Sequence, residues 1–288
     1  MDLSEAGLEP SPAAMRELIA QVADRVIAYY GSLENQRASD TEGAAEVAGL
    51  VVEALPEKGQ PYESLLELIF SRLISKGFNT NAPGSFSYIN GGALFHCAIA
   101  DLITAVTNPY VGYWGASPGM AQVEDTVIRW FADMIGWPAG AGGVLLSGGS
   151  LANLSALIAA RKALLGDDFG LGTLYASDQV HHSINKAAML AGFPEDALRL
   201  IPSDGAFRLR IDALTERVAE DRKAGRRPFL VIGTAGTTNS GAVDDLQRLG
   251  SFASANELWF HVDAAYGGFF ALTERGRAVL QGIELADT

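Results

Sequence analysis

The residues best suited to chemistry in this chain are a carboxylate and the small residues that follow it. Residues 258–262 (LWFHV) are mostly apolar and predict a buried strand that ends at Asp263. The next five residues, 264–268, include two alanines and two glycines. Open α/β sheets bind ligands at the carboxyl ends of their parallel strands. A buried carboxylate there needs a cationic or hydrogen-bonding partner. A flat ring with a protonated pyridine nitrogen, lying against the small residues, would supply one.

A second motif, residues 147–161 (SGGSLANLSALIAAR), follows a strand-like run and opens a helix. Gly148 and Gly149 allow a ligand close to the backbone, and Ser150 is predicted to cap the helix and to offer a hydroxyl. The free N–H groups at such a helix start bind anions such as phosphate. An ordinary capped turn fits the same residues about as well, so the motif alone does not decide.

Two further loops also follow strand-like runs. Residues 175–188 (YASDQVHHSINKAA) carry His181 and His182, either of which could stack on an aromatic ligand. Taken singly, such histidines are more often capping or surface residues. Residues 233–238 (GTAGTT) place small hydroxyl side chains after a strand, although an ordinary loop between strand and helix explains them too.

Taken together, the four loops are more specific. In a parallel sheet they meet at one edge, where they offer phosphate donors, a stacking ring, hydroxyls and a carboxylate. Those are the groups that pyridoxal 5'-phosphate (PLP) requires. A metal site is not predicted, because the four histidines and one cysteine show no ligand spacing. A serine-hydrolase site is not predicted either, because no G-x-S-x-G sequence follows a strand-like run, as a nucleophile elbow would.

The elements that must position these loops alternate along the chain. Helical patterns at 13–30, 43–54 and 62–75 make the N-terminal third helical, without strand signals, and a loop follows at 79–92. Beyond it, strand-like runs lie at 143–147, 173–177, 198–202, 229–234 and 258–262, with helical patterns at 120–135, 151–165, 183–191, 211–224 and 244–254. This alternation predicts an α/β fold with a mostly parallel sheet covered by helices on both faces.

Composition narrows the class of protein. The net charge of −13 argues against a nucleic-acid partner, because no Lys/Arg cluster could neutralise phosphates. The single cysteine, Cys97, excludes a disulfide within the chain and suits a reducing compartment. The first ten residues are acidic and do not form a signal peptide. The most apolar stretch, 91–106, is too short to span a membrane. We therefore expect a cytoplasmic protein without nucleic-acid or membrane partners.

With these motifs in view, the chain resembles the group II PLP-dependent amino-acid decarboxylases, which include the aromatic-L-amino-acid, glutamate and diaminobutyrate enzymes. The resemblance runs from Glu53 to the end, through residues 113–125 (YWGASPGMAQVED) and the SGGSLANL, SDQVHHS, GTT and HVDAAYGG motifs in order. It implies the PLP-dependent transferase fold (aspartate aminotransferase-like, fold type I). Residues 1–85 would form a helical N-terminal segment, and residues 86–288 the PLP-binding large domain.

The resemblance also implies roles for particular residues. Gly149 and Ser150 would hold the cofactor's phosphate, and His181 would stack on its ring. Asp263 would bind the pyridine nitrogen. The remaining positions are Thr238 beside cofactor and substrate, Ala265 on the opposite ring face, and Tyr88 and Tyr110 in the substrate pocket. Asn90 and Gly91 stand where the aromatic decarboxylases have a Pro-Thr pair, which weighs against an aromatic substrate.

The end of the chain differs from the family pattern. The family's Schiff-base lysine follows HVDAAYGG in a segment that begins like IELADT, whereas this chain stops at Thr288, and Lys162 and Lys186 lie in other motifs. We therefore expect an N-terminal portion without the catalytic lysine and the small C-terminal domain.

Decarboxylation of an L-amino acid to the amine and CO₂ is the expected function of the intact enzyme, a homodimer in which the helices of residues 13–76 pack on the partner subunit. Two alternatives stay open. One is a non-catalytic fragment or one half of a split enzyme. The other is an aminotransferase, carbon–carbon lyase or aldehyde synthase of the same fold.

Overall fold

The computed structural model describes residues 9–86 and 89–288. The chain divides into two compact units between Thr107 and Asn108. The domain boundary expected from the sequence, between residues 85 and 86, stays a prediction.

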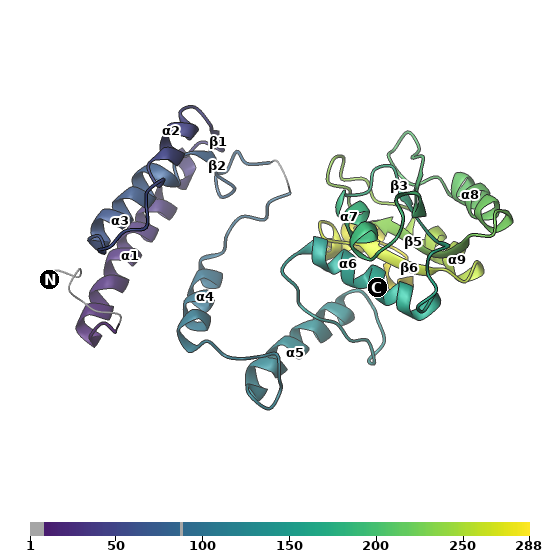
Figure 1. Cartoon of the computed structure of the whole chain (residues 1–288), viewed down its shortest axis with the longest axis horizontal. Coiled ribbons are helices and arrows are strands. Elements are labelled where there is room, and N and C mark those ends of the chain that lie inside the picture. Colours follow the sequence, from purple (N-terminus) through teal and green to yellow (C-terminus); the bar gives the residue numbers. More distant parts are fainter. Residues whose placement is uncertain (1–8, 87–88) are drawn as a thin grey trace. The chain divides into compact units, whose positions relative to one another are not determined.

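The first unit is mainly helical (Figure 1). Its helices are α1 (Pro12–Ser32), α2 (Ala44–Gly49) and α3 (Tyr62–Leu68), which continues into a π-helical turn at Ile69–Leu73. Helix α1 starts at Ser11, whose hydroxyl accepts a hydrogen bond from the Ala14 N–H. These helices lie where periodicity predicts them. The structure adds one short antiparallel ladder that the sequence does not predict, between β1 (Ser39–Asp40) and β2 (Gly77–Phe78).

A further helix, α4 (Phe95–Thr107), occupies most of the apolar stretch for which the sequence analysis predicts no element, and none of its residues is buried. No helix in residues 9–86 or 89–288 combines the length and the apolar character that crossing a membrane requires.

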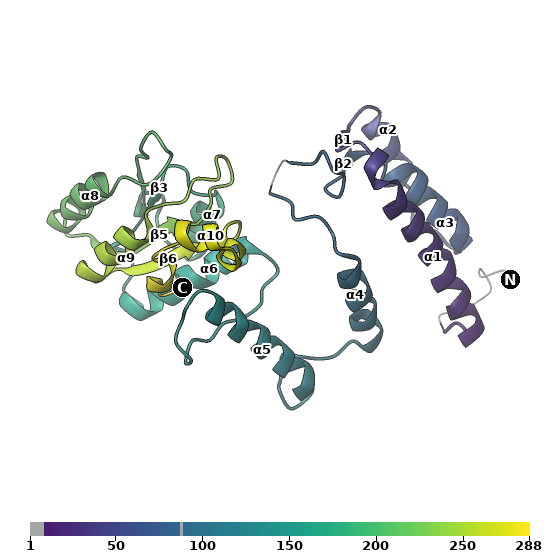
Figure 2. The same ribbon diagram turned by 180° about the vertical axis from the view of Figure 1, so that it is seen from behind.

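The second unit is built on a parallel sheet with strand order β4-β3-β5-β6. Its strands are β3 (Gly172–Ser177), β4 (Leu198–Ile201), β5 (Arg227–Thr234) and β6 (Trp259–Asp263), which match four of the five predicted runs. Helices α5 (Pro118–Met134), α6 (Gly149–Leu164), α7 (Ser183–Leu190), α8 (Ile211–Lys223), α9 (Leu246–Ala255) and α10 (Glu274–Val279) accompany them (Figure 2). The predicted α/β architecture is therefore confirmed.

Two hydrophobic clusters form the core on the two faces of the sheet. On one face, Leu157 of α6 and Ile184 of α7 pack with Leu230 and Ile232 of β5. The other cluster joins residues of α8 and α9 to the alternate strand positions, including Val231 and Phe260. Because side chains alternate along a strand, this division decides which face each polar strand residue meets.

The run predicted as a strand at 143–147 is not one. Residues 141–146 have no regular secondary structure, and Val144 and Leu145 are exposed. The Leu145 N–H lies 3.2 Å from the Glu124 carboxylate instead of bonding to a neighbouring strand. A strand needs such a ladder, and an apolar run alone does not provide one.

Residues 287 and 288 lie along the free side of β6. The N–H of Asp287 donates to the Phe260 carbonyl at 2.8 Å, and the N–H of Val262 donates to the Thr288 carbonyl at 2.9 Å. This pairing brings Thr288 against the His261 side chain, which lies two residues before Asp263.

Candidate active site

Asp263 is the buried carboxylate at the end of β6, as predicted, with 8% of its surface exposed. One carboxylate oxygen accepts the Ala265 N–H at 3.2 Å, and the other accepts the Asn153 amide at 2.9 Å. No cation among the described residues forms an ion pair with it. Both donors are neutral, so the buried negative charge has no cationic partner in this part of the chain.

Asn153 connects Asp263 to the histidine motif. It lies on α6, is 4% exposed, and its amide nitrogen also donates to the Ser183 hydroxyl at 2.9 Å. The Ser183 oxygen is in turn 2.9 Å from Nδ1 of His181. The N–H of Ser183 points to the same Nδ1 at 3.3 Å. Packing of α6 and α7 on one face of the sheet thus places the predicted His181 and Asp263 in a single hydrogen-bonded cluster.

His261 completes that cluster from the strand. It shares a sheet face with Asp263, and its Nε2 lies 2.9 Å from the Asn153 carbonyl oxygen. Its Nδ1 lies 3.1 Å from both the hydroxyl and the carbonyl oxygen of Thr288. Burial lowers the pKa of His261, and the nearby Asp263 charge offsets this only partly. Burial therefore favours the neutral form of the His261 ring.

The two adjacent histidines differ in environment. His181 is half-buried and hydrogen-bonded, whereas His182 is exposed. Their ring centroids lie 4.1 Å apart at an angle of 48°. The neighbouring charge of His181 is the main cause that lowers the pKa of His182, followed by desolvation and the charge of Lys186. Of the two, His181 is the one connected to Asp263.

The predicted phosphate loop lies at the start of α6. Gly148 is the N-cap with φ of 149°, a conformation that glycine tolerates, and α6 begins at Gly149. Ser150 is therefore the second helical residue, not the cap as predicted, and its side chain is exposed. A Cβ added to Gly149 would lie 3.2 Å from the Cβ of Ala265, so the loop sits directly against the residues after Asp263.

In the hydroxyl loop, the structure separates the threonines. Thr238 is exposed and lies in the turn after β5, with no contact to Asp263. Thr234, at the end of β5, pairs in register with Asp263 and is 4% exposed. Its hydroxyl is buried and has no hydrogen-bond partner among the residues described. Thr234 is thus the hydroxyl that the fold places beside Asp263, and sequence reasoning missed it.

Asp244 holds the end of β5 in place. Its carboxylate accepts the N–H of Leu209 at 2.7 Å and that of Thr234 at 2.9 Å. Burial raises the pKa of Asp244, and these two backbone hydrogen bonds oppose the rise. Both of its oxygens are used by backbone groups, which is the pattern of a carboxylate that supports a loop.

The remaining predicted positions are not brought into this cluster. Tyr110 is exposed, and its ring packs near Gly112. Tyr88 lies outside the described residues. Lys162 pairs with Asp167 at the surface, and Lys186 is exposed on α7. The roles implied for the site residues stay predictions.

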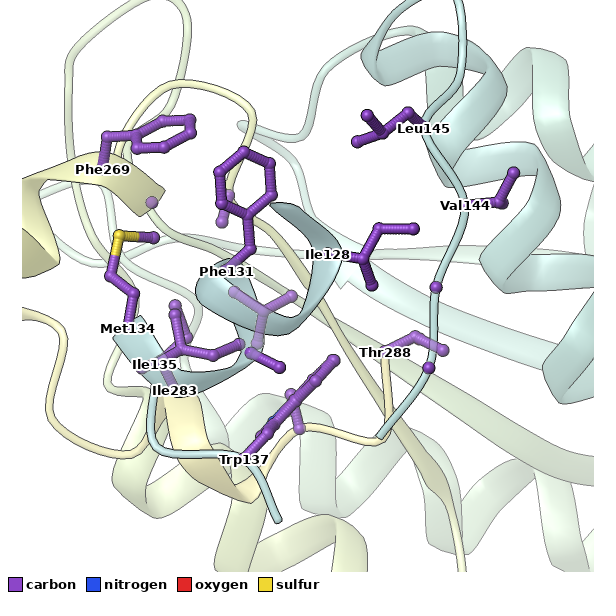
Figure 3. Close-up of a pocket in the computed structure, with 17 residues that line it drawn as sticks. Ile128, Phe131, Met134, Ile135, Trp137, Val144, Leu145, Phe269, Ile283 and Thr288 are labelled. Atoms are coloured by element: carbon purple, nitrogen blue, oxygen red, sulfur yellow. The ribbon is translucent and has the colours of Figure 1, made fainter. Parts of the chain in front are cut away.

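An apolar groove of about 300 Å³ lies on the other side of β6 (Figure 3). It is bounded by α5 and residues 142–145, with Phe131 and Phe269 in edge-to-face contact at 5.2 Å. Val262 lines it, and Val262 alternates with Asp263 along the strand, so the carboxylate belongs to the opposite face. No side-chain carboxylate, imidazole or amine lines this groove, and Thr288 is the lining residue that also contacts His261.

Three residues of the cluster could have been found from their spacing. Asn153 follows Gly149 by one helical turn, a polar residue within an apolar helical pattern. His261 precedes Asp263 by two, so the two share a face of the strand. Ser183 follows His181 by two, at the start of α7.

Comparison with known proteins identifies the family to which this chain belongs. The model of the pyridoxal-dependent decarboxylase conserved domain matches residues 46–288. An aromatic-L-amino-acid decarboxylase of Bacillus atrophaeus is 34% identical over 281 residues, which cover 98% of this chain and 58% of that protein.

Solved structures of similar proteins lead to the same family. Rhodiola rosea 4-hydroxyphenylacetaldehyde synthase superposes with a TM-score of 0.89 at 28% identity, covering 96% of this chain and 62% of that one. Oryza sativa TDC with PLP gives a TM-score of 0.88 at 29% identity, with the same two coverages. The chain thus spans about 60% of the length of the proteins it matches. The expected PLP-dependent transferase fold is confirmed, and the chain belongs to the pyridoxal-dependent decarboxylase family, whose cofactor is PLP.

Proposed function

We propose that this chain binds PLP at the edge where β5 and β6 end, and that the protein it belongs to decarboxylates an L-amino acid to the amine and CO₂. The observation that carries this proposal is the state of Asp263. It is a buried carboxylate held by two neutral donors and without a cation in the described part of the chain. A protonated pyridine nitrogen supplies the missing charge.

Other features of the edge fit the same cofactor. The buried Thr234 hydroxyl has no partner in the described residues and lies in register with Asp263. The absence of side chains at Gly148 and Gly149 leaves the start of α6 open toward a phosphate, which Gly149 and Ser150 would hold. His181 would stack on the ring, Ala265 would pack against the other face, and Thr238 would complete the cofactor side.

When bound, PLP supplies an electron sink for the pair left at Cα as CO₂ departs. The residues of this chain set the conditions for that chemistry. The negative charge of Asp263 keeps a proton on the ring nitrogen, which makes the ring a better acceptor. His181 restricts the ring's orientation, and the small residues 264–268 let it lie close to the backbone. Tyr88 and Tyr110 would contact the substrate.

Cofactor binding tests the central assignment. Asp263→Asn keeps the shape of the side chain and removes its charge, so we expect PLP affinity to fall about tenfold or more, because hydrogen bonds between charged groups contribute roughly 1.5–3 kcal/mol. Fluorescence titration of the chain with PLP measures this. Asp167→Asn is the control, since Asp167 is an exposed carboxylate beyond the C-terminal end of α6 and should leave the affinity unchanged. Equal PLP affinity in Asp263→Asn and the unsubstituted chain would refute the assignment.

The reaction is tested on protein purified from its native host, so that any polypeptide that accompanies or continues this chain is present. A panel of L-amino acids should release CO₂ and the matching amine from one substrate class. A 2-oxo acid without CO₂ would show an aminotransferase instead. An aldehyde as the main product would show an aldehyde synthase, the activity named for the Rhodiola rosea neighbour.

Assembly and location are part of the proposal. The uncovered helix α4 and the helices of residues 13–76 support a homodimer, because apolar helix faces are stable only when covered. The free, exposed Cys97 supports a reducing, cytoplasmic environment.

A further inference from the structure

Two side chains that the proposed function assigns to PLP, His181 and Asp263, are joined through two residues to which sequence analysis assigns no role. Asn153 donates to the Asp263 carboxylate and to the Ser183 hydroxyl, both at 2.9 Å. Ser183 then contacts His181 Nδ1 at 2.9 Å. Asn153 and Ser183 are 4% and 1% exposed, so solvent does not compete for these hydrogen bonds.

The donors and acceptors fix the orientation of the Asn153 amide. An ionised carboxylate only accepts, so the NH₂ group of Asn153 must face Asp263, and its carbonyl oxygen must face His261. That oxygen requires a proton on His261 Nε2, 2.9 Å away. His261 Nδ1 lies 3.1 Å from both the hydroxyl and the carbonyl oxygen of Thr288, so each ring nitrogen of His261 faces an acceptor.

The hydrogen bonds between Asn153, Ser183 and His181 also have a fixed direction. The Ser183 oxygen accepts one N–H of Asn153, and its own hydrogen is free to donate to His181 Nδ1. The backbone N–H of Ser183 also points at that nitrogen, 3.3 Å away. With two donors converging on Nδ1, the ring proton of neutral His181 must lie on Nε2.

We propose that Asn153 and Ser183 are positioning residues: Asn153 orients the Asp263 carboxylate, and Ser183 holds His181 in its Nε2–H tautomer. Ring orientation and carboxylate orientation are thereby set by one hydrogen-bonded link before the cofactor arrives. The relevance to catalysis rests on the proposed function, but the link itself is a property of the cofactor-free chain.

Ring nitrogen chemical shifts read the tautomers directly. The chain has four histidines, so ¹⁵N-histidine labelling gives a small set of signals that His96→Gln, His182→Gln and His261→Gln variants assign. Magic-angle spinning spectra can be recorded on sedimented protein as well as on a soluble sample. At mildly alkaline pH and without PLP, we expect His181 to show a single neutral Nε2–H form. A proton on Nδ1 of His181 in the unsubstituted chain would overturn the proposal, and this test needs no variant to fold.

Variants then locate the cause. Ser183→Ala should turn His181 into a mixture of tautomers, and Ser183→Thr, which keeps the hydroxyl, should restore the single form. Ser251→Ala is the control, because the Ser251 hydroxyl only bonds to a carbonyl of its own helix, α9. An unchanged His181 spectrum in a folded Ser183→Ala variant would contradict the role of Ser183.

The link to Asp263 is tested by PLP titration. Asn153→Ala should weaken PLP binding roughly threefold to tenfold, the effect of losing one hydrogen bond to the Asp263 carboxylate. The two proposals fail differently. A chain with the expected tautomers that does not bind PLP would refute the proposed function alone, whereas PLP binding unaffected by Asn153→Ala would refute the positioning role alone.

Discussion

At the scale of single residues, three buried carboxylates show how partners separate structural from functional roles. Asp221 accepts hydrogen bonds from Arg199 and Tyr175. Burial raises its pKa, but these hydrogen bonds outweigh burial and the net pKa is lowered. Asp244 is saturated by two backbone N–H groups. Asp263 is the one of the three that has neither a cationic partner nor two backbone donors. It is therefore the carboxylate that a cationic ligand would bind.

The buried His261 predicts a dependence of stability on pH. Burial lowers its folded-state pKa below the ordinary 6.5, so the unfolded state binds the proton more tightly. Its contribution to stability is therefore complete above pH 6.5 and is lost as pH falls below that value. We expect the free energy of unfolding to fall by up to about 1.4 kcal/mol per pH unit as the pH falls below 6.5.

Urea unfolding at several pH values measures this slope. His261→Gln should flatten it, while His96→Gln, which removes an exposed histidine, should leave it unchanged. The same slope in His261→Gln and the unsubstituted chain would show that another group causes the acid sensitivity.

At the scale of elements, the site depends on the close approach of two loops that follow β5 and β6. The Ala235 N–H donates to the Asp263 carbonyl at 2.9 Å, and a Cβ on Gly267 would lie 1.9 Å from the Ala235 carbonyl oxygen. Position 267 therefore has no room for a side chain. A shift of the loop that carries Ala265 would also displace Asp263, because the two segments are in direct contact.

We therefore expect Gly267→Ala to lower the free energy of unfolding by about 1–3 kcal/mol, the usual effect of an inserted methyl group in a packed region. It should weaken PLP binding as well, because the backbone beside Asp263 shifts. Gly205→Ala is the matched control, since a Cβ at Gly205 has no atom within 4 Å. Chemical denaturation of the two variants measures this difference. Equal denaturation midpoints for Gly267→Ala and Gly205→Ala would contradict the prediction.

At the scale of the whole molecule, the first unit leaves apolar helix surface uncovered. Ile99, Leu102, Ile103 and Val106 of α4 are all exposed and fall on one side of the helix. A second copy of the protein is the partner that the proposed dimer would bring to this surface.

We expect the protein from its native host to sediment as a homodimer, and the 288-residue chain alone to dimerise poorly or to aggregate. Ile103→Glu should reduce self-association strongly, whereas Thr104→Glu, on the other side of α4, should not. Sedimentation of the unsubstituted 288-residue chain as a well-behaved monomer would contradict this prediction.

Much of the candidate site could be predicted from the sequence because its signals are local. Alternation of apolar strands and amphipathic helices predicted the parallel sheet, and the position of Asp263 at a strand end predicted a buried carboxylate. Both depend on periods of two and 3.6 residues, which short windows of sequence contain. Where a run needed a distant partner, as at 143–147, the same reasoning predicted a strand that the structure does not form.

Only the tertiary structure decided how the parts meet. The hydrogen bond between Asn153 and Asp263 joins residues 110 positions apart, and it exists because α6 packs across β6. The same packing connects His181, but not His182, to the carboxylate, and strand register sets Thr234 beside Asp263 while leaving Thr238 exposed. Local sequence determines which face of an element is polar. Which polar groups become partners depends on the burial of apolar faces against each other, and that is settled only when the whole chain folds.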